Sequence, residues 1–215
     1  MAVSFRPDCT LCPRLATFLR DTQRAQPEYF CKPVPPFGDA RPKLLIVGLA
    51  PGMHGANRTG RPFTGDYAGI LLYESLHVIG LASAPVSRDR FDDLKLRGVR
   101  ISNAVKCLPP ENKPLPVEIR TCNRYLKAEL EELDSVRSIL ALGTVAHDSV
   151  LMAMGLKKSA ARFGHGSEHE LPGGRLMIDS YHCSRYNTQT RRLTTPMFHE
   201  VLTRAATLAG LSVTR

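Results

Sequence analysis

The 215-residue sequence has no run of eighteen apolar residues, so we expect no transmembrane helix and no membrane partner. Its first residues, MAVSFRPDCTLCPR, lack the apolar segment of a signal peptide and carry charge early. We therefore expect a cytoplasmic protein whose thiols stay reduced. Internal repeats and linkers are also missing, and the length predicts one domain over residues 1–215.

Acidic residues are few relative to basic ones. The chain has 20 Asp and Glu against 29 Lys and Arg, a formal net charge of +9. This excess indicates either a solvated basic surface or a polyanionic partner such as nucleic acid. Arginines gather in SRYNTQTRRLT (184–194), beside hydroxyl and amide side chains that can bind phosphate oxygens, which favours nucleic acid.

The glycine-rich stretch GLAPGMHGANRTGRPFTGD (48–66) lacks the lysine and the Ser/Thr of a P-loop. Its glycine spacing also differs from that of a dinucleotide-binding loop. Glycine at this density still lets a backbone come close to a ligand or adopt a positive φ. The stretch therefore predicts one wall of a binding pocket for another class of ligand.

Short apolar runs and amphipathic segments alternate along the chain. The apolar runs predict strands buried on both faces, at residues 43–48, 99–105, 138–143 and 175–181. Between and after them we expect helices at 67–80, 117–133, 144–154 (with Thr144 as N-cap) and 195–209 (with Pro196 in the first turn). Segments 81–97 and 155–174 are expected to be connections. The fold class is therefore α/β, with a central four-stranded parallel sheet in a three-layer α/β/α sandwich.

Four of the six cysteines are candidate metal ligands. Cys9 and Cys12 form a C-x2-C pair, Cys107 follows the second strand, and Cys122 lies beyond the proline-rich CLPPENKP (107–114). The prolines predict an extended, non-helical loop. Four thiolates can bind zinc or an iron–sulfur cluster, and the spacing leaves both open, together with free buried thiols. We expect Cys31 and Cys183 to be small apolar core residues.

Three motifs in a fixed order resemble those of a family 5 (type b) uracil-DNA glycosylase, within the iron–sulfur uracil-DNA glycosylase superfamily: GLAPG with GRPFTGD, NAVKCLPPENKP, and SYHxSRxNTQT. The resemblance extends from Cys9 to about Leu211. It implies a four-stranded parallel sheet between helices. It also implies that a [4Fe–4S] cluster, bound by Cys9, Cys12, Cys107 and Cys122, ties an N-terminal helix to the loop after the second strand.

The resemblance implies an activity as well: excision of uracil and of other deaminated bases such as hypoxanthine and xanthine from DNA, leaving an abasic site. No lysine is recognisable as a Schiff-base nucleophile, so the enzyme is expected to be a monofunctional hydrolase. The expected partner is DNA that contains deaminated bases, and the protein is expected to be a monomer.

Two residues are the candidate catalytic groups. His182, at the end of the fourth strand, would donate a hydrogen bond to uracil O2 as the base departs. Asp66 would orient or deprotonate the attacking water, although aspartate at that position is also a natural N-cap for the helix at 67–80. Family 4 enzymes have an acidic residue at the position that Leu49 occupies here. A leucine side chain cannot act on water, so the resemblance implies that Asp66 does so instead.

The remaining candidates would bind the base or the DNA. Phe63 would stack on an extruded base and Asn103 would read its edge, against the simpler roles of a core phenylalanine and a strand-end amide. The other predicted base-pocket residues belong to the loop after the first strand: Gly48, Leu49, Ala50 and Gly52. The predicted DNA contacts are Arg58, Arg185, Asn187 and Gln189. Cys183 departs from the proline that family 4 has there, which leaves the geometry of the 184–191 loop open.

Two alternatives remain at this stage. One is a uracil-restricted enzyme like those of family 4, against which Leu49 argues. The other is a non-catalytic Fe–S module that binds nucleic acid, in which Asp66 is only a helix cap.

Overall fold

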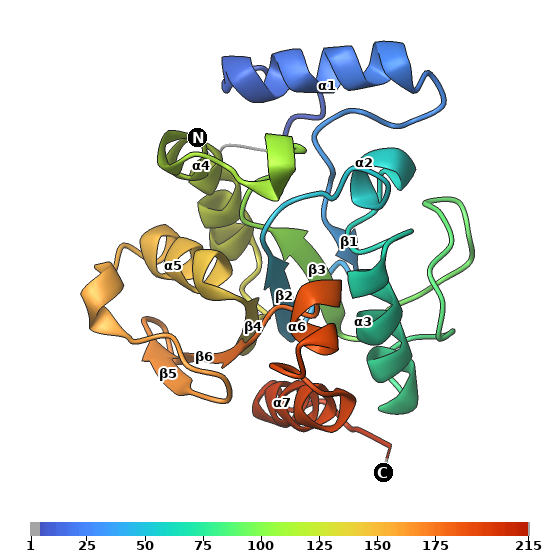
Figure 1. Ribbon diagram of the computed structural model, residues 1–215. Helices are drawn as coiled ribbons and strands as arrows, with labels where there is room; N and C mark the ends of the chain where they lie inside the picture. Colours follow the sequence, from blue (N-terminus) through green and yellow to red (C-terminus); the bar gives the residue numbers. More distant parts are fainter. Residues whose placement is uncertain (1–4, 215) are drawn as a thin grey trace.

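The computed structural model of the protein describes residues 5–214 and contains one six-stranded sheet (Figure 1). The strand order is β1-β3-β2-β4-β6-β5. The strands are β1 (Phe37–Gly38), β2 (Leu44–Gly48), β3 (Val99–Asn103), β4 (Ser138–Leu142), β5 (Glu168–Leu171) and β6 (Arg175–Ser180).

The four central strands are the ones that the apolar runs predicted, and they pair in parallel. The expected count of four is nevertheless too low, because β1 and β5 add antiparallel edge strands to β3 and β6. Strand β5 lies in the 155–174 segment, which was expected to be only a connection. The positive φ values of Gly173 (79°) and Gly174 (72°) reverse the chain there and return it as a hairpin into β6.

Helices cover both faces of the sheet, which confirms the three-layer α/β/α sandwich (Figure 1). The α-helices are α1 (Pro13–Ala25), α2 (Ala56–Thr59), α3 (Tyr67–Val78), α4 (Pro116–Glu132), α5 (Thr144–Ala153), α6 (Arg185–Gln189) and α7 (Thr195–Leu208). Two 3-10 turns, η1 (Pro110–Asn112) and η2 (Lys158–Ala160), complete the elements. Among residues 5–214, no helix combines the length and apolarity needed to cross a membrane.

Successive residues of β2 point to opposite faces of the sheet and so build two cores. Leu44 and Ile46 pack in the layer that contains α3 and α7. Leu45 and Val47 pack on the other face, with α4 and α5. A strand with an apolar layer on each face must be apolar throughout, which explains why these runs were visible in the sequence.

Two local expectations are wrong. Thr144 is the first residue of α5 rather than its cap; the N-cap is Gly143, whose φ of 94° favours glycine. The loop 107–114 is not extended throughout, because η1 forms a single 3-10 turn inside it. That turn depends on positive φ values at Glu111 (54°) and Asn112 (56°), which proline spacing alone cannot reveal.

The parallel strands end at one edge of the sheet. Gly48 and Asn103 are register partners at the ends of β2 and β3, and β6 ends two residues before His182. Segments that are distant in the sequence therefore meet at this edge.

Candidate functional site

A cavity of about 550 Å³ lies at the carboxyl edge of the sheet. It is formed by the loop after β2, the end of β3 and the loop after β6. The predicted site residues that line it are Leu49, Ala50, Gly52, Phe63, Asp66, Asn103, His182 and Arg185. Its volume lies within the roughly 300–1,000 Å³ range of small-molecule sites.

Phe63 lies between the end of β2 and His182. Its ring stacks on the His182 imidazole, with centroids 5.8 Å apart and planes at 27°. A Cβ at Gly48 would lie 2.5 Å from Phe63 Cζ, so a residue with a side chain could not occupy this position without displacing the ring. Gly48 is therefore behind the cavity wall rather than among the residues that line it.

His182 presents a neutral imidazole to the cavity. Burial lowers its pKa to about 4, because the charged form is poorly solvated there. The loop that carries it is held by Asn187, whose Nδ2 donates a 2.8 Å hydrogen bond to the His182 carbonyl oxygen. At neutral pH the histidine can thus donate one N–H without adding a positive charge.

Asp66 is both a helix cap and a cavity residue. Its Oδ1 accepts a hydrogen bond of 3.1 Å from Gly69 N at the start of α3, which confirms the N-cap expectation. Its Oδ2 faces the glycine-rich stretch 48–66, since it lies 3.1 Å from where a Cβ at Gly52 would be. Burial raises the pKa of Asp66, although the amides of Gly69 and Ala68 partly oppose this shift.

Asn103 brings a buried and unpaired acceptor to the cavity. Its side chain is 3% exposed, and its Oδ1 has no hydrogen-bond partner in the described part of the chain. A buried carbonyl oxygen without a donor costs about 1–3 kcal/mol. The Oδ1 is therefore not satisfied by the protein around it, and it lies against Gly48, 2.6 Å from where a Cβ there would be.

The four predicted DNA contacts lie in different settings. Arg185 is exposed and lines the cavity. Arg58 and Gln189 are exposed but do not line it, and Arg58 Nε donates to the His54 carbonyl oxygen at 2.8 Å. Asn187 is half-buried and uses its amide nitrogen to hold the His182 backbone.

Several lining residues were missed by sequence reasoning: Met53, His54, Gly55, Ala56, Tyr67, Ala68, Asn112 and Ser184. Most of them neighbour a predicted residue, so treating the glycine-rich stretch and the start of α3 as one wall would have found them. Asn112 is different. It belongs to η1, and no signal in the sequence places that turn against the cavity.

The four candidate ligand cysteines meet at a second, small cavity between the segment leading into α1, the loop after β3, and α4. All six cysteines of the chain lie in its described part and none forms a disulfide. The Lys106 backbone N–H donates to Cys122 Sγ over 3.3 Å. Burial, with the nearby thiols, raises the pKa of Cys12 to about 11. Cys31 and Cys183 are buried, as expected for apolar core residues.

The spacing of these thiols bears on which group they fit. Among residues 5–214, no three of the cysteine sulfurs form a group within 4.8 Å of one another. Thiolates on a single tetrahedral zinc, with Zn–S bonds of about 2.3 Å, lie about 3.8 Å apart. A four-iron cluster binds each thiolate to a different iron and so requires wider separation. The four thiols therefore line one cavity without reaching the spacing of a single zinc site.

Comparison with known proteins gives the same family as the motifs. Residues 35–206 match the uracil DNA glycosylase superfamily. The chain is 51% identical over 209 residues to a type-5 uracil-DNA glycosylase of Thermus thermophilus, covering 94% of each protein. It is 41% identical over 207 residues to a type-5 enzyme of Pyrobaculum aerophilum, covering 94% of this chain and 90% of that protein. A type-4 enzyme of Thermotoga maritima is 34% identical to this chain over 148 residues, covering 68% of this chain and 67% of that protein.

The cap and the buried charge of Asp66 can be separated by two substitutions. Both Asp66→Asn and Asp66→Ala remove the carboxylate, but only asparagine keeps an oxygen that can accept from Gly69 N. We expect Asp66→Asn to be more stable than Asp66→Ala by about 1 kcal/mol in urea denaturation. Equal stabilities would show that the cap contributes nothing.

The pH dependence of the unfolding free energy of the wild type and Asp66→Asn tests whether burial destabilises the ionised carboxylate. A folded-state pKa above the unfolded value means that the ionised Asp66 opposes folding at neutral pH. Asp66→Asn should therefore be at least as stable as the wild type at pH 7. The difference should shrink as the pH falls through the folded-state pKa of Asp66.

Proposed function

Because this chain belongs to the uracil DNA glycosylase superfamily, we propose that it is a monofunctional DNA glycosylase. It would hydrolyse the N-glycosidic bond of uracil in DNA and leave an abasic site. The observation that carries the proposal is the convergence of an aromatic ring, an unpaired amide oxygen, a neutral imidazole and a carboxylate on one cavity. In the described part of the chain, no lysine lines this cavity, which agrees with hydrolysis without a Schiff base.

The substrate base must leave the duplex before the bond can be reached. We assign the capture of the strand to exposed Arg58, Arg185 and Gln189, with Arg185 closest to the cavity. The net charge of +9 favours attraction to phosphates. Asn187 would hold the His182 loop while its remaining Oδ1 accepts from a donor on the DNA.

The unpaired Oδ1 of Asn103 suggests how three deaminated bases are distinguished from cytosine and adenine, although thymine and guanine carry the same ring N–H and need another contact to exclude them. Uracil, hypoxanthine and xanthine each carry a ring N–H beside a carbonyl, whereas cytosine and adenine have an unprotonated nitrogen at the matching position. A buried acceptor stabilises the first group and opposes a lone pair from the second. We therefore propose activity on hypoxanthine and xanthine as well as on uracil, with the extruded base stacked on Phe63.

Bond cleavage places negative charge on the departing base and positive charge on the sugar. When the C1′–N bond breaks, its electron pair stays with the base, and in uracil the charge concentrates on O2. The neutral His182 N–H would stabilise this charge by a hydrogen bond. It would not act as a general acid, since a pKa of about 4 leaves it unprotonated at neutral pH.

Asp66 would supply the negative charge next to the cationic sugar. It would orient a water for attack on C1′ and accept its proton as the new C–O bond forms. The pKa of Asp66, raised by burial, makes the carboxylate a stronger base than an exposed aspartate. Its Oδ1 stays on the helix cap, so Oδ2 is the atom available for the water.

We further propose that Cys9, Cys12, Cys107 and Cys122 bind a [4Fe–4S] cluster. Such a cluster supplies redox-capable iron, but hydrolysis needs no electron, so its task would be structural. The four thiols come from the segment before α1, the loop after β3, and α4. Joining them would fix the loop that leads from Asn103 to Asn112, both of which line the cavity.

The proposed activity is tested with oligonucleotides that contain one uracil, hypoxanthine or xanthine, followed by alkaline cleavage of abasic sites. We expect cleavage at all three bases and none at cytosine or adenine. Cleavage of uracil alone would support a uracil-restricted enzyme like those of family 4. Binding of these oligonucleotides without any cleavage would support a non-catalytic Fe–S module.

The role of Asp66 is tested by the activity of Asp66→Asn and Asp66→Ala. General-base catalysis typically contributes about 10²–10⁴-fold, so both variants should lose this much single-turnover rate while still binding uracil-containing DNA. The wild-type rate should fall as the pH drops through the pKa of Asp66, because protonation removes the base. If the asparagine variant kept the wild-type rate, Asp66 would be a cap only.

The cluster is tested by counting iron and acid-labile sulfide in protein purified without oxygen. We expect about four of each per chain and a brown protein. Cys107→Ser and Cys122→Ser should lose both, while Cys31→Ser, another buried cysteine outside the group, should keep them. A colourless protein with one zinc ion per chain at these cysteines would overturn the cluster proposal.

A further inference from the structure

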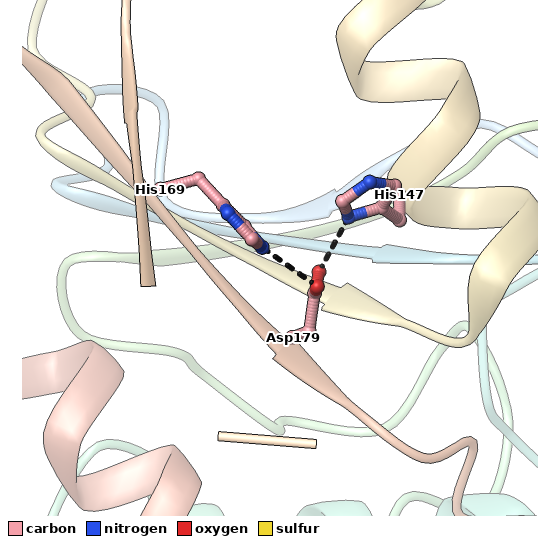
Figure 2. A group of neighbouring side chains, drawn as sticks. All are labelled: His147, His169 and Asp179. Atoms are coloured by element: carbon pink, nitrogen blue, oxygen red, sulfur yellow. Dashed lines mark hydrogen bonds and ion pairs between the residues drawn. The ribbon is translucent and has the colours of Figure 1, made fainter. Parts of the chain in front are cut away.

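Three side chains that the proposed reaction does not use converge on a second site. His147 comes from α5, His169 from the edge strand β5, and Asp179 from β6 (Figure 2). Figure 2 shows both imidazoles turned toward the same carboxylate. None of the three residues lines the cavity that holds Asp66 and His182.

The cluster is buried and closely spaced. The side chains of Asp179 and His147 are 0% and 1% exposed, and that of His169 is 14% exposed. His147 Nδ1 lies 2.8 Å from Asp179 Oδ1, and His169 Nε2 lies 2.9 Å from Oδ2. One ligand atom from each residue falls within a 4.8 Å group. A carboxylate buried this deeply needs hydrogen-bond donors or a cation in place of its lost hydration.

A backbone carbonyl lies on the other side of the His147 ring. The Ala161 carbonyl oxygen is 3.2 Å from His147 Nε2, and a carbonyl only accepts, so this contact is a hydrogen bond in the tautomer that carries its hydrogen on Nε2. In the neutral imidazole, Nδ1 then holds a lone pair that faces the carboxylate oxygen. In this tautomer Nδ1 and Asp179 Oδ1 are both acceptors 2.8 Å apart, an arrangement that a bound metal ion would relieve.

The supporting contacts are those of a metal site. A metal-binding histidine usually donates its second ring N–H to a carbonyl or carboxylate, and His147 Nε2 lies in position to donate to the Ala161 carbonyl oxygen. The carboxylate is oriented as well, since Gly164 N donates to Asp179 Oδ2 at 3.2 Å. The partial exposure of His169 leaves a path for an ion to enter.

We propose that His147, His169 and Asp179 bind one divalent transition-metal ion, with zinc as the best match. Two imidazoles and one carboxylate favour zinc and its neighbours over magnesium or calcium, which prefer oxygen ligands only. Ligands about 2.0–2.1 Å from a tetrahedral ion lie about 3.3 Å apart, so each nitrogen–oxygen pair would open by about half an ångström. The inference does not depend on the glycosylase activity.

The ion would have a structural role near the carboxyl edge of the sheet. Asp179 precedes His182 by three residues on the same segment, and His169 and Ala161 belong to the long connection from α5 to β6. That connection already touches the catalytic loop, because the His165 ring stacks on Tyr181 with centroids 5.0 Å apart. A metal bound by α5, β5 and β6 would hold the connection and the start of the His182 loop together.

The experiment is equilibrium dialysis of the full-length, iron-containing protein against zinc, with zinc and iron counted per chain. We expect one zinc in addition to unchanged iron, and a zinc-dependent rise in the thermal unfolding midpoint. His169→Gln, at the partly exposed edge strand, should weaken zinc binding by at least about tenfold. Asp179→Asn should do the same. His77→Gln removes a histidine on α3 outside the cluster and should bind zinc like the wild type.

Three outcomes would overturn the proposal. Absence of bound zinc in the wild type would mean that the three side chains only hydrogen-bond one another. Equal zinc binding in His169→Gln and Asp179→Asn would place the ion elsewhere. Zinc uptake matched by loss of iron would place it at the cysteines. Because these readouts count metal rather than base release, they stand apart from any result on the glycosylase activity.

Discussion

The missing side chain at Gly48 is the constraint on which the cavity at the carboxyl edge of the sheet depends. At the end of β2, a Cβ would lie 2.5 Å from the Phe63 ring and 2.6 Å from Asn103 Oδ1. Glycine lets both groups close onto the strand end, and the ring then stacks on His182. Phe63 has a positive φ of 53°, a conformation that typically costs about 1–3 kcal/mol in a bulky residue. Gly69, against the Phe63 carbonyl, leaves room for that strained backbone.

Asp66 shows how one carboxylate can cap a helix and also face a cavity. Its Oδ1 accepts from Gly69 N and so fixes the side chain, while Oδ2 faces the glycine-rich stretch 48–66. The cap determines the position, and burial determines the basicity by raising the pKa. The two readings of Asp66 from the sequence are therefore compatible, since a base that must meet a water in one place benefits from a rigid anchor.

The sequence predicted the features that depend on local pattern or on a long motif. The four central strands were visible because both of their faces are buried. The edge strands β1 and β5 were missed, because they have two and four residues and little burial. The motifs located Asp66, Phe63 and His182, but the stacking of Phe63 on His182 and the unpaired oxygen of Asn103 are tertiary facts. The His147 cluster was missed because its members carry no motif and meet only through the fold.

The loops at the carboxyl edge need anchors, because the edge of a sheet gives them few partners of its own. The loop after β2 is fixed by the Asp66 cap and the glycine contacts. The loop after β3 is flanked by the four thiols. The loop after β6 is held by Asn187 and preceded by Asp179 with its two histidines. Each loop is thus anchored by different groups: a helix cap, thiols or hydrogen bonds. The cavity can therefore be rigid although the segments that form it are irregular. Rigidity of that kind is what a preorganised N–H and carboxylate require.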